Sequence, residues 1–177
     1  MTVATAETKA FGRIQPAGSR RAAALASRLE QGAWALAEFA KGLDAAEWQL
    51  RTPHDGRKVG VIVHHVASMY PIEMELAGKL VAGDPIAGVT WDDVDAINAA
   101  HAAKFDAASQ TATIDLLLEN SAAAASVIRS LSEEELERAA PISLDGDAPL
   151  TSQYFLEYHP VRHAWHHLAK LRAAVAR

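Results

Sequence analysis

Long stretches of this sequence place apolar side chains three and four residues apart, and this spacing restricts the fold more than any other feature. Residues 19–43 keep the pattern for about six turns, as an amphipathic helix does. Half of the chain is apolar but only 6% is aromatic, and alanine is abundant. Alanine is the best helix former and a poor strand residue, so the composition favours closely packed helices over sheets.

Capping residues and helix breakers predict where the helices begin and end. Asp44 and Glu47 have the spacing of a capping box and open a short second segment. The next long helix is expected over residues 58–82, with a kink at Pro71. A third helix is expected to begin at Thr90.

The second half of the chain repeats these signals. A helical run is expected over residues 113–131, and a capping box at Ser132 and Glu135 opens another short segment. Residues 142–150 can hold a short extended piece, although we expect no sheet there. The last helix is expected over residues 151–177.

Long helices joined by loops, without an alternating strand pattern, predict an all-α fold. We expect a four-helix bundle with short connecting helices. Residues 1–18 lack a regular apolar pattern and are expected to form a loose N-terminal arm. Residues 19–177 are expected to form a single domain, because a chain of this length can build one full hydrophobic core.

Charge and composition argue against several classes of function. The net charge of −5 and the pI near 5.9 argue against a nucleic-acid binder, which needs a basic face. The chain has no cysteine, and therefore no disulfide and no thiolate metal ligand. No stretch is apolar enough for a membrane span or a signal peptide. We therefore expect a cytoplasmic protein that acts on a small molecule, without nucleic-acid or membrane partners.

The histidines suggest a metal site. Four of the eight fall within nine residues near the C-terminus: His159, His163, His166 and His167. His163 and His167 are four residues apart, so on a helix they share one face and can bind one ion. His65 falls within the apolar stripe of the 58–82 helix and offers a third ligand, whereas His64 points nearly the opposite way. Three neutral imidazoles suit Zn²⁺ or Ni²⁺.

Two alternatives stay open at this stage. His159 can replace one ligand, although Pro160 disturbs the helix beside it. The histidines can instead line a solvated face, because the bulky stripe of the last helix lies roughly opposite His163 and His167. In a metal-binding protein both faces of this helix then need cover, one from the bundle and the other from something else, such as a second subunit.

Two segments, RKVGVIVHHVASM (residues 57–69) and RHAWHHLAKLRAA (residues 162–174), resemble the signature regions of the DinB/YfiT-like superfamily. The resemblance covers nearly the whole chain from residue 19. It implies a four-helix bundle, often a homodimer, that binds a divalent metal through three histidines. Carried onto this sequence, the ligands are His65, His163 and His167. The chain departs from the pattern at Ala169 and Lys170, where glycine and glutamine are usual.

Further residues are candidates for catalysis and for binding. Glu73 and His101 are the best placed general bases, although Glu73 can instead be exposed by the Pro71 kink and His101 can be a satisfied core residue. The cations that can bind an anionic thiol, or simply face solvent, are Arg57, Arg162 and Lys170.

The function we expect is that of a metal-dependent S-transferase, in which the metal lowers the pKa of a low-molecular-weight thiol. The first alternative is a metal-dependent hydrolase, in which bound hydroxide attacks an ester or amide. A second is a non-catalytic metal-binding stress protein. A helical bundle whose histidines merely face solvent is the remaining possibility.

Overall fold

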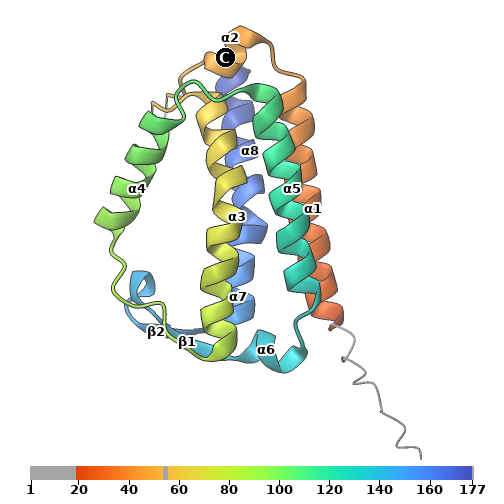
Figure 1. Ribbon diagram of the computed structural model, residues 1–177, viewed down its shortest axis with the longest axis vertical. Helices are drawn as coiled ribbons and strands as arrows, with labels where there is room; N and C mark the ends of the chain where they lie inside the picture. Colours follow the sequence, from red (N-terminus) through yellow and green to blue (C-terminus); the bar gives the residue numbers. More distant parts are fainter. Residues whose placement is uncertain (1–18, 54–55, 177) are drawn as a thin grey trace, which may run out of the picture.

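A computed structural model describes residues 19–53 and 56–176, and Figure 1 shows long helices standing side by side. The N-terminal arm expected over residues 1–18 lies outside the described residues. The bundle consists of α1 (Arg20–Lys41), α3 (Val59–Ala82), α5 (Gln110–Arg129) and a C-terminal run. That run contains α7 (Ser152–Leu156), a π-helical turn η2 (Glu157–Val161) and α8 (Arg162–Val175). The all-α bundle predicted from the apolar spacing is therefore confirmed.

The predicted caps set most of the helix boundaries. Ser19 accepts a hydrogen bond from the Ala22 backbone at 2.9 Å and so begins α1. Gly83 ends α3 with φ of +87°, a conformation that glycine adopts without strain. The two short helices, α2 (Ala45–Gln49) and α6 (Glu133–Glu137), both begin with the predicted capping boxes.

Two helix boundaries differ from those expected. Helix α5 begins at Gln110 and not at Thr113, because Ser109 serves as its N-cap. The last helical run begins one residue later than expected, at Ser152, and η2 interrupts it at Pro160. Proline has no N–H to donate to the preceding turn, so the wider π-helical turn forms there.

The expectation that no sheet forms was wrong. Strands β1 (Ala139–Ile142) and β2 (Ala148–Thr151) pair antiparallel, with Ala139 opposite Thr151, and η1 (Ser143–Asp145) joins them. Four-residue strands give only a weak sequence signal. Part of their support comes from a distant loop, because Ile86 donates its N–H to the Pro141 carbonyl and accepts from the Ser143 N–H.

Helix α4 (Trp91–Lys104) lies beside the bundle and not within it, as Figure 1 shows. It begins at the predicted Thr90 cap, and none of its residues is buried. It approaches α3 with its C-terminal end, where His101 and Phe105 contact His64. No helix in the described part of the chain is long and apolar enough to cross a membrane.

Helix α2 is fixed across the start of α3 by Trp48. A Cβ atom built on Gly60 would lie only 2.3 Å from the Trp48 ring, so only glycine lets the indole lie there. The indole N–H donates to the Ala108 carbonyl at 2.9 Å, on the segment between α4 and α5. Trp48 thus joins three segments at the end of the molecule where α3 begins.

This packing predicts opposite effects for two glycine-to-alanine changes in one helix. Gly60→Ala should lower the free energy of unfolding by about 1–3 kcal/mol, because the Trp48 ring has to move. Gly78→Ala, which meets nothing within 4 Å, should raise it by about 0.5–1 kcal/mol through helix propensity. Urea denaturation of both variants checks the pair, and equal effects would contradict the packing described here.

Candidate metal centre

Three histidines from two helices meet inside the bundle. His65 comes from α3, and His163 and His167 come from α8 one turn apart. One nitrogen from each ring lies within 4.8 Å of the other two. His65 is buried and its ring meets the other two edge-on, at centroid distances of 5.0 and 5.6 Å. The structure therefore brings together the three histidines that the sequence selected.

The distance between two of these nitrogens fits a shared ion. His65 Nε2 and His163 Nε2 are 3.2 Å apart. Two ligands of tetrahedral zinc, each about 2.0–2.1 Å from the ion, stand roughly 3.3 Å from one another. Two imidazole lone pairs at this distance repel one another unless a proton or a cation lies between them. The donor set and its spacing thus suit a divalent ion such as Zn²⁺ or Ni²⁺.

Glu73 orients one of the three rings. Glu73 is only 4% exposed, and its Oε1 lies 3.0 Å from His163 Nδ1. A carboxylate accepts from Nδ1–H, which leaves the lone pair of His163 on Nε2, directed at the other histidines. The expectation that the Pro71 kink exposes Glu73 was wrong. Helix α3 continues through Pro71 as one element, so Glu73 stays on the inner face.

Burial keeps His167 in the neutral form that a metal ligand needs. Desolvation is the largest cause and lowers its pKa from 6.5 to about 2, with smaller contributions from His163, His65 and the charge of Arg57. The metal-free ring therefore carries no proton on one nitrogen at neutral pH. That nitrogen is available to an ion without the expulsion of a proton.

A second histidine pair lies beside the three. His101, from α4, places Nε2 at 3.0 Å from His64 Nδ1 and 3.2 Å from Ser68 Oγ. Its ring lies 5.5 Å from that of His65. Burial lowers the pKa of His101 to about 4. Its Nδ1 is buried without a hydrogen-bond partner among the described residues, so His101 is not the satisfied core residue that was one expectation.

Sequence reasoning missed the partners of this pair. His64 was assigned only as a neighbour of the ligand His65. In the structure its ring stacks on Phe105 at 3.9 Å and contacts His101, both near the end of α4. The signal was its position away from the apolar stripe, which predicted that it faces something other than the bundle core. The sequence did not show where α4 lies, so the residues that His64 contacts could not be identified.

The remaining candidates lie in different places. His159 is outside the cluster of three; its ring stacks on Phe155, and burial is the largest cause of its lowered pKa. Arg57 lies at the start of α3, close enough for its charge to lower the pKa of both His101 and His167. Arg162 is exposed with its guanidinium over the Tyr158 ring, and Lys170 is also exposed.

The aromatic face of the last helical run is open to solvent. Tyr154, Tyr158 and Trp165 are 41–47% exposed, and the two tyrosine rings stack at 5.6 Å. The histidines therefore occupy the covered face of this run. Cover for the aromatic face by a second subunit stays a prediction.

Comparisons with known proteins add one finding to this geometry. No protein-family model matches the sequence, and no curated protein matches it. Among solved structures, the chain is similar to YfiT from Bacillus subtilis, with a TM-score of 0.72 at 17% identity. The match covers 98% of this chain and 93% of that one. The chain has the YfiT fold.

YfiT is described as a probable metal-dependent hydrolase with an unusual four-helix bundle topology. At 17% identity the likeness establishes the fold alone. The resemblance to the DinB/YfiT-like superfamily, inferred from two short motifs, is thereby confirmed for the architecture. Within that fold, the three-histidine group of this chain has the composition and spacing of a metal site.

The Glu73–His163 hydrogen bond predicts a specific effect on metal affinity in this YfiT fold. Glu73→Gln should weaken zinc binding about 10–100-fold, because the amide no longer fixes the ring as a carboxylate does. Competition with a chromophoric chelator measures the affinity. Glu75→Gln, an exposed change two residues along α3, is the matched control and should leave it unaltered. Equal affinities for both variants would contradict the orienting role of Glu73.

The lowered histidine pKa values predict how the metal-free protein responds to acid. Between pH 7 and 5 the unfolded chain gains protons at histidines whose ordinary pKa is 6.5. Folded His167 and His101 stay neutral until about pH 2 and 4. The unfolded state then binds more protons, so the free energy of unfolding should fall as the pH decreases. Urea titrations at several pH values check this, and a constant free energy from pH 7 to 5 would refute it.

Proposed function

We propose that this chain is a divalent-metal-dependent enzyme with His65, His163 and His167 as the metal ligands. The observation that carries the proposal is the convergence of three imidazole nitrogens within 4.8 Å of one another. The cluster contains no fourth histidine, cysteine or carboxylate among the described residues. Three protein ligands with a vacant fourth position are typical of catalytic zinc sites, whereas structural sites have four.

A divalent ion held there would act as a Lewis acid that lowers the pKa of a water or thiol. The residues of the chain have separate tasks around it. Glu73 holds His163 in one tautomer and is thereby committed to positioning. His101 remains the candidate base, because it is neutral above about pH 4 and its Nδ1 has no partner among the described residues.

Hydrolysis of an ester or amide is the reaction that we favour. The structural likeness to YfiT, described as a probable metal-dependent hydrolase, supports it. In this reaction water adds to the carbonyl carbon and the alcohol or amine leaves with a proton. His101 can accept the proton of the attacking water and return it to the leaving group.

Thiol transfer is the second candidate, and the resemblance of the two histidine segments to the superfamily motifs favours it. The chain has no cysteine, so the thiol has to come from a second substrate such as glutathione. The thiolate then displaces a leaving group from an electrophile. Glu73 and His101 would have the same positions in either reaction, so only the dependence on added thiol distinguishes the two.

Loss of one ligand tests the metal centre and the function together. His65→Ala should lower the bound metal from about one ion per chain to a small fraction, measured by elemental analysis. Turnover of 4-nitrophenyl acetate, or of glutathione with 1-chloro-2,4-dinitrobenzene, should fall to the uncatalysed rate. His166→Ala removes a neighbouring histidine outside the cluster and is the matched control.

The outcomes separate the candidates. Ester hydrolysis without thiol supports the hydrolase, and turnover that requires glutathione supports the transferase. Stoichiometric metal without either activity would favour a non-catalytic metal-binding protein. A wild-type protein that binds no metal after incubation with zinc or nickel would refute the proposal.

A further inference from the structure

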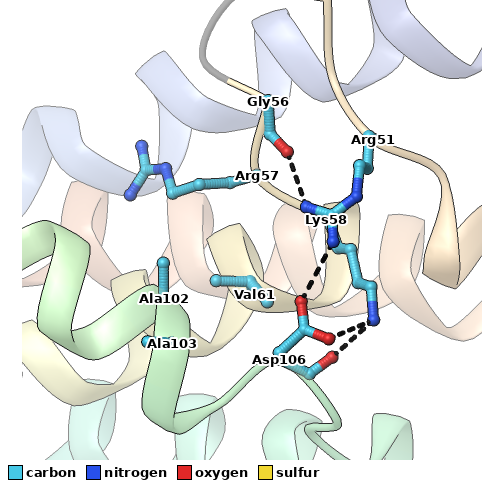
Figure 2. Close-up of a pocket in the computed structure, with 8 residues that line it drawn as sticks. All are labelled: Arg51, Gly56, Arg57, Lys58, Val61, Ala102, Ala103 and Asp106. Carbon is cyan, nitrogen blue, oxygen red and sulfur yellow. Dashed lines mark hydrogen bonds and ion pairs between the residues drawn. The ribbon is translucent and has the colours of Figure 1, made fainter.

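A recess lies at the start of α3, and one of its lining residues, Val61, is one helical turn before His65. It is a cavity of about 270 Å³ between the segment that joins α2 to α3, the first turn of α3 and the end of α4. Its polar lining comes from Arg51, Arg57, Lys58 and Asp106, and its apolar lining includes Val61 and Ala102 (Figure 2). Sequence reasoning had singled out only Arg57 among these residues.

Positive side chains outnumber negative ones in the described lining of this cavity. Lys58 is 17% exposed at its side chain and places Nζ at 2.6 Å from Asp106 Oδ2. Arg51 lies 3.4 Å from the other oxygen of the same carboxylate. The hydrogen bond from Lys58 is the largest cause of the lowered pKa of Asp106, which therefore stays ionised. Of the described residues that line the cavity, three carry positive charge and one carries negative charge.

The N-terminal end of helix α3 adds to the positive potential of the cavity. Lys58 is its N-cap and makes no side-chain capping bond, and the first turn contains no acidic residue. The partial positive charge of a helix N-terminus is then not compensated from within the first turn. This contribution has the same sign as the three cations, so the described lining of the cavity favours an anion.

The cavity adjoins the metal centre through both helices that line it. Val61 precedes His65 by one turn of α3, which corresponds to a rise of about 6 Å. Ala102 directly follows His101 on α4. Figure 2 shows the Arg57 guanidinium extending away from the Lys58 and Asp106 group.

We propose that this cavity binds the carboxylate end of the substrate, whose reacting bond then lies at the three-histidine centre. This inference rests on the proposed function and narrows the substrate class to organic acids with a short apolar segment next to the carboxylate. Enclosing sites for drug-sized ligands measure about 300–1,000 Å³, so this cavity holds one end of a molecule. Val61 and Ala102 contact the apolar segment, and the cations pair with the carboxylate.

A purely structural role for the same cations makes a different prediction. Lys58 and Arg51 can instead serve only to hold α3 against the segment after α4, with Asp106 as their shared partner. Loss of Asp106 then destabilises the local structure and weakens any binding in the cavity. If the cavity binds an anion, Asp106 competes with the ligand for both cations. Asp106→Asn should then strengthen carboxylate binding, whereas Lys58→Gln should weaken it about tenfold.

The binding test uses the metal-free full chain, so that it does not depend on the metal centre. Benzoate is titrated against the isotope-labelled protein, and amide NMR signals are followed. Shifts at Gly56, Val61 and Ala102 are expected with benzoate, and not with the neutral benzamide. Lys79→Gln, an exposed lysine near the other end of α3, is the matched control and should leave the affinity unaltered. Circular dichroism verifies that each variant is folded.

The second test links the cavity to turnover. In the zinc-loaded protein, the ratio of kcat/KM for mono-4-nitrophenyl succinate over 4-nitrophenyl acetate should exceed one, and Lys58→Gln should reduce it. Equal shifts with benzoate and benzamide, weaker binding in a folded Asp106→Asn variant, or an unchanged ratio would overturn the proposal. Loss of all turnover with intact benzoate binding would instead count against hydrolysis alone.

Discussion

The hydrogen bond between Glu73 and His163 joins the two helices on which the site depends. It links α3 to α8 across ninety residues of sequence, inside a bundle whose other contacts are mostly apolar. A buried carboxylate is costly unless it is hydrogen-bonded, so this contact favours one register of α8 against α3. In that register His163 Nε2 faces His65 Nε2. A slide of either helix by one turn would separate the rings and take the Glu73 carboxyl group away from His163.

The sequence predicted most of the helices and selected the three histidines that the structure brings together. Caps such as Ser19, Asp44 and Ser132 act locally, and their hydrogen bonds form within a few residues of each. The pairing of His163 with His167 follows from helix geometry alone. Their meeting with His65 did not follow from spacing, since it depends on how α8 packs against α3; the apolar stripe and the motif order supplied that step.

Features that depend on contacts between distant segments were not predictable in the same way. The strand pair depends partly on Ile86, more than fifty residues upstream. The burial of Glu73 depends on α3 continuing through Pro71, whereas proline inside a helix usually predicts a bend. The position of α4 could not be inferred, because its apolar residues form no face that packs on the bundle and none of them is buried.

Two glycines let bulky indole rings pack closely against helices of the bundle. A Cβ on Gly32 would lie 2.8 Å from Trp165 Nε1, and one on Gly60 would lie 2.3 Å from the Trp48 ring. Gly32 thus lets the Trp165 indole of α8 pack against α1, and Gly60 lets the Trp48 indole of α2 pack against α3. Helices α3 and α8 carry the three histidines. Helix α4 has no such anchor of its own and reaches α3 mainly through His101 and Phe105. The three proposed metal ligands are therefore on helices with buried faces, whereas the candidate base and one wall of the proposed carboxylate cavity are on α4, none of whose residues is buried. In this arrangement the lining of the proposed cavity includes none of the three histidines, whose spacing depends on how α3 and α8 pack together.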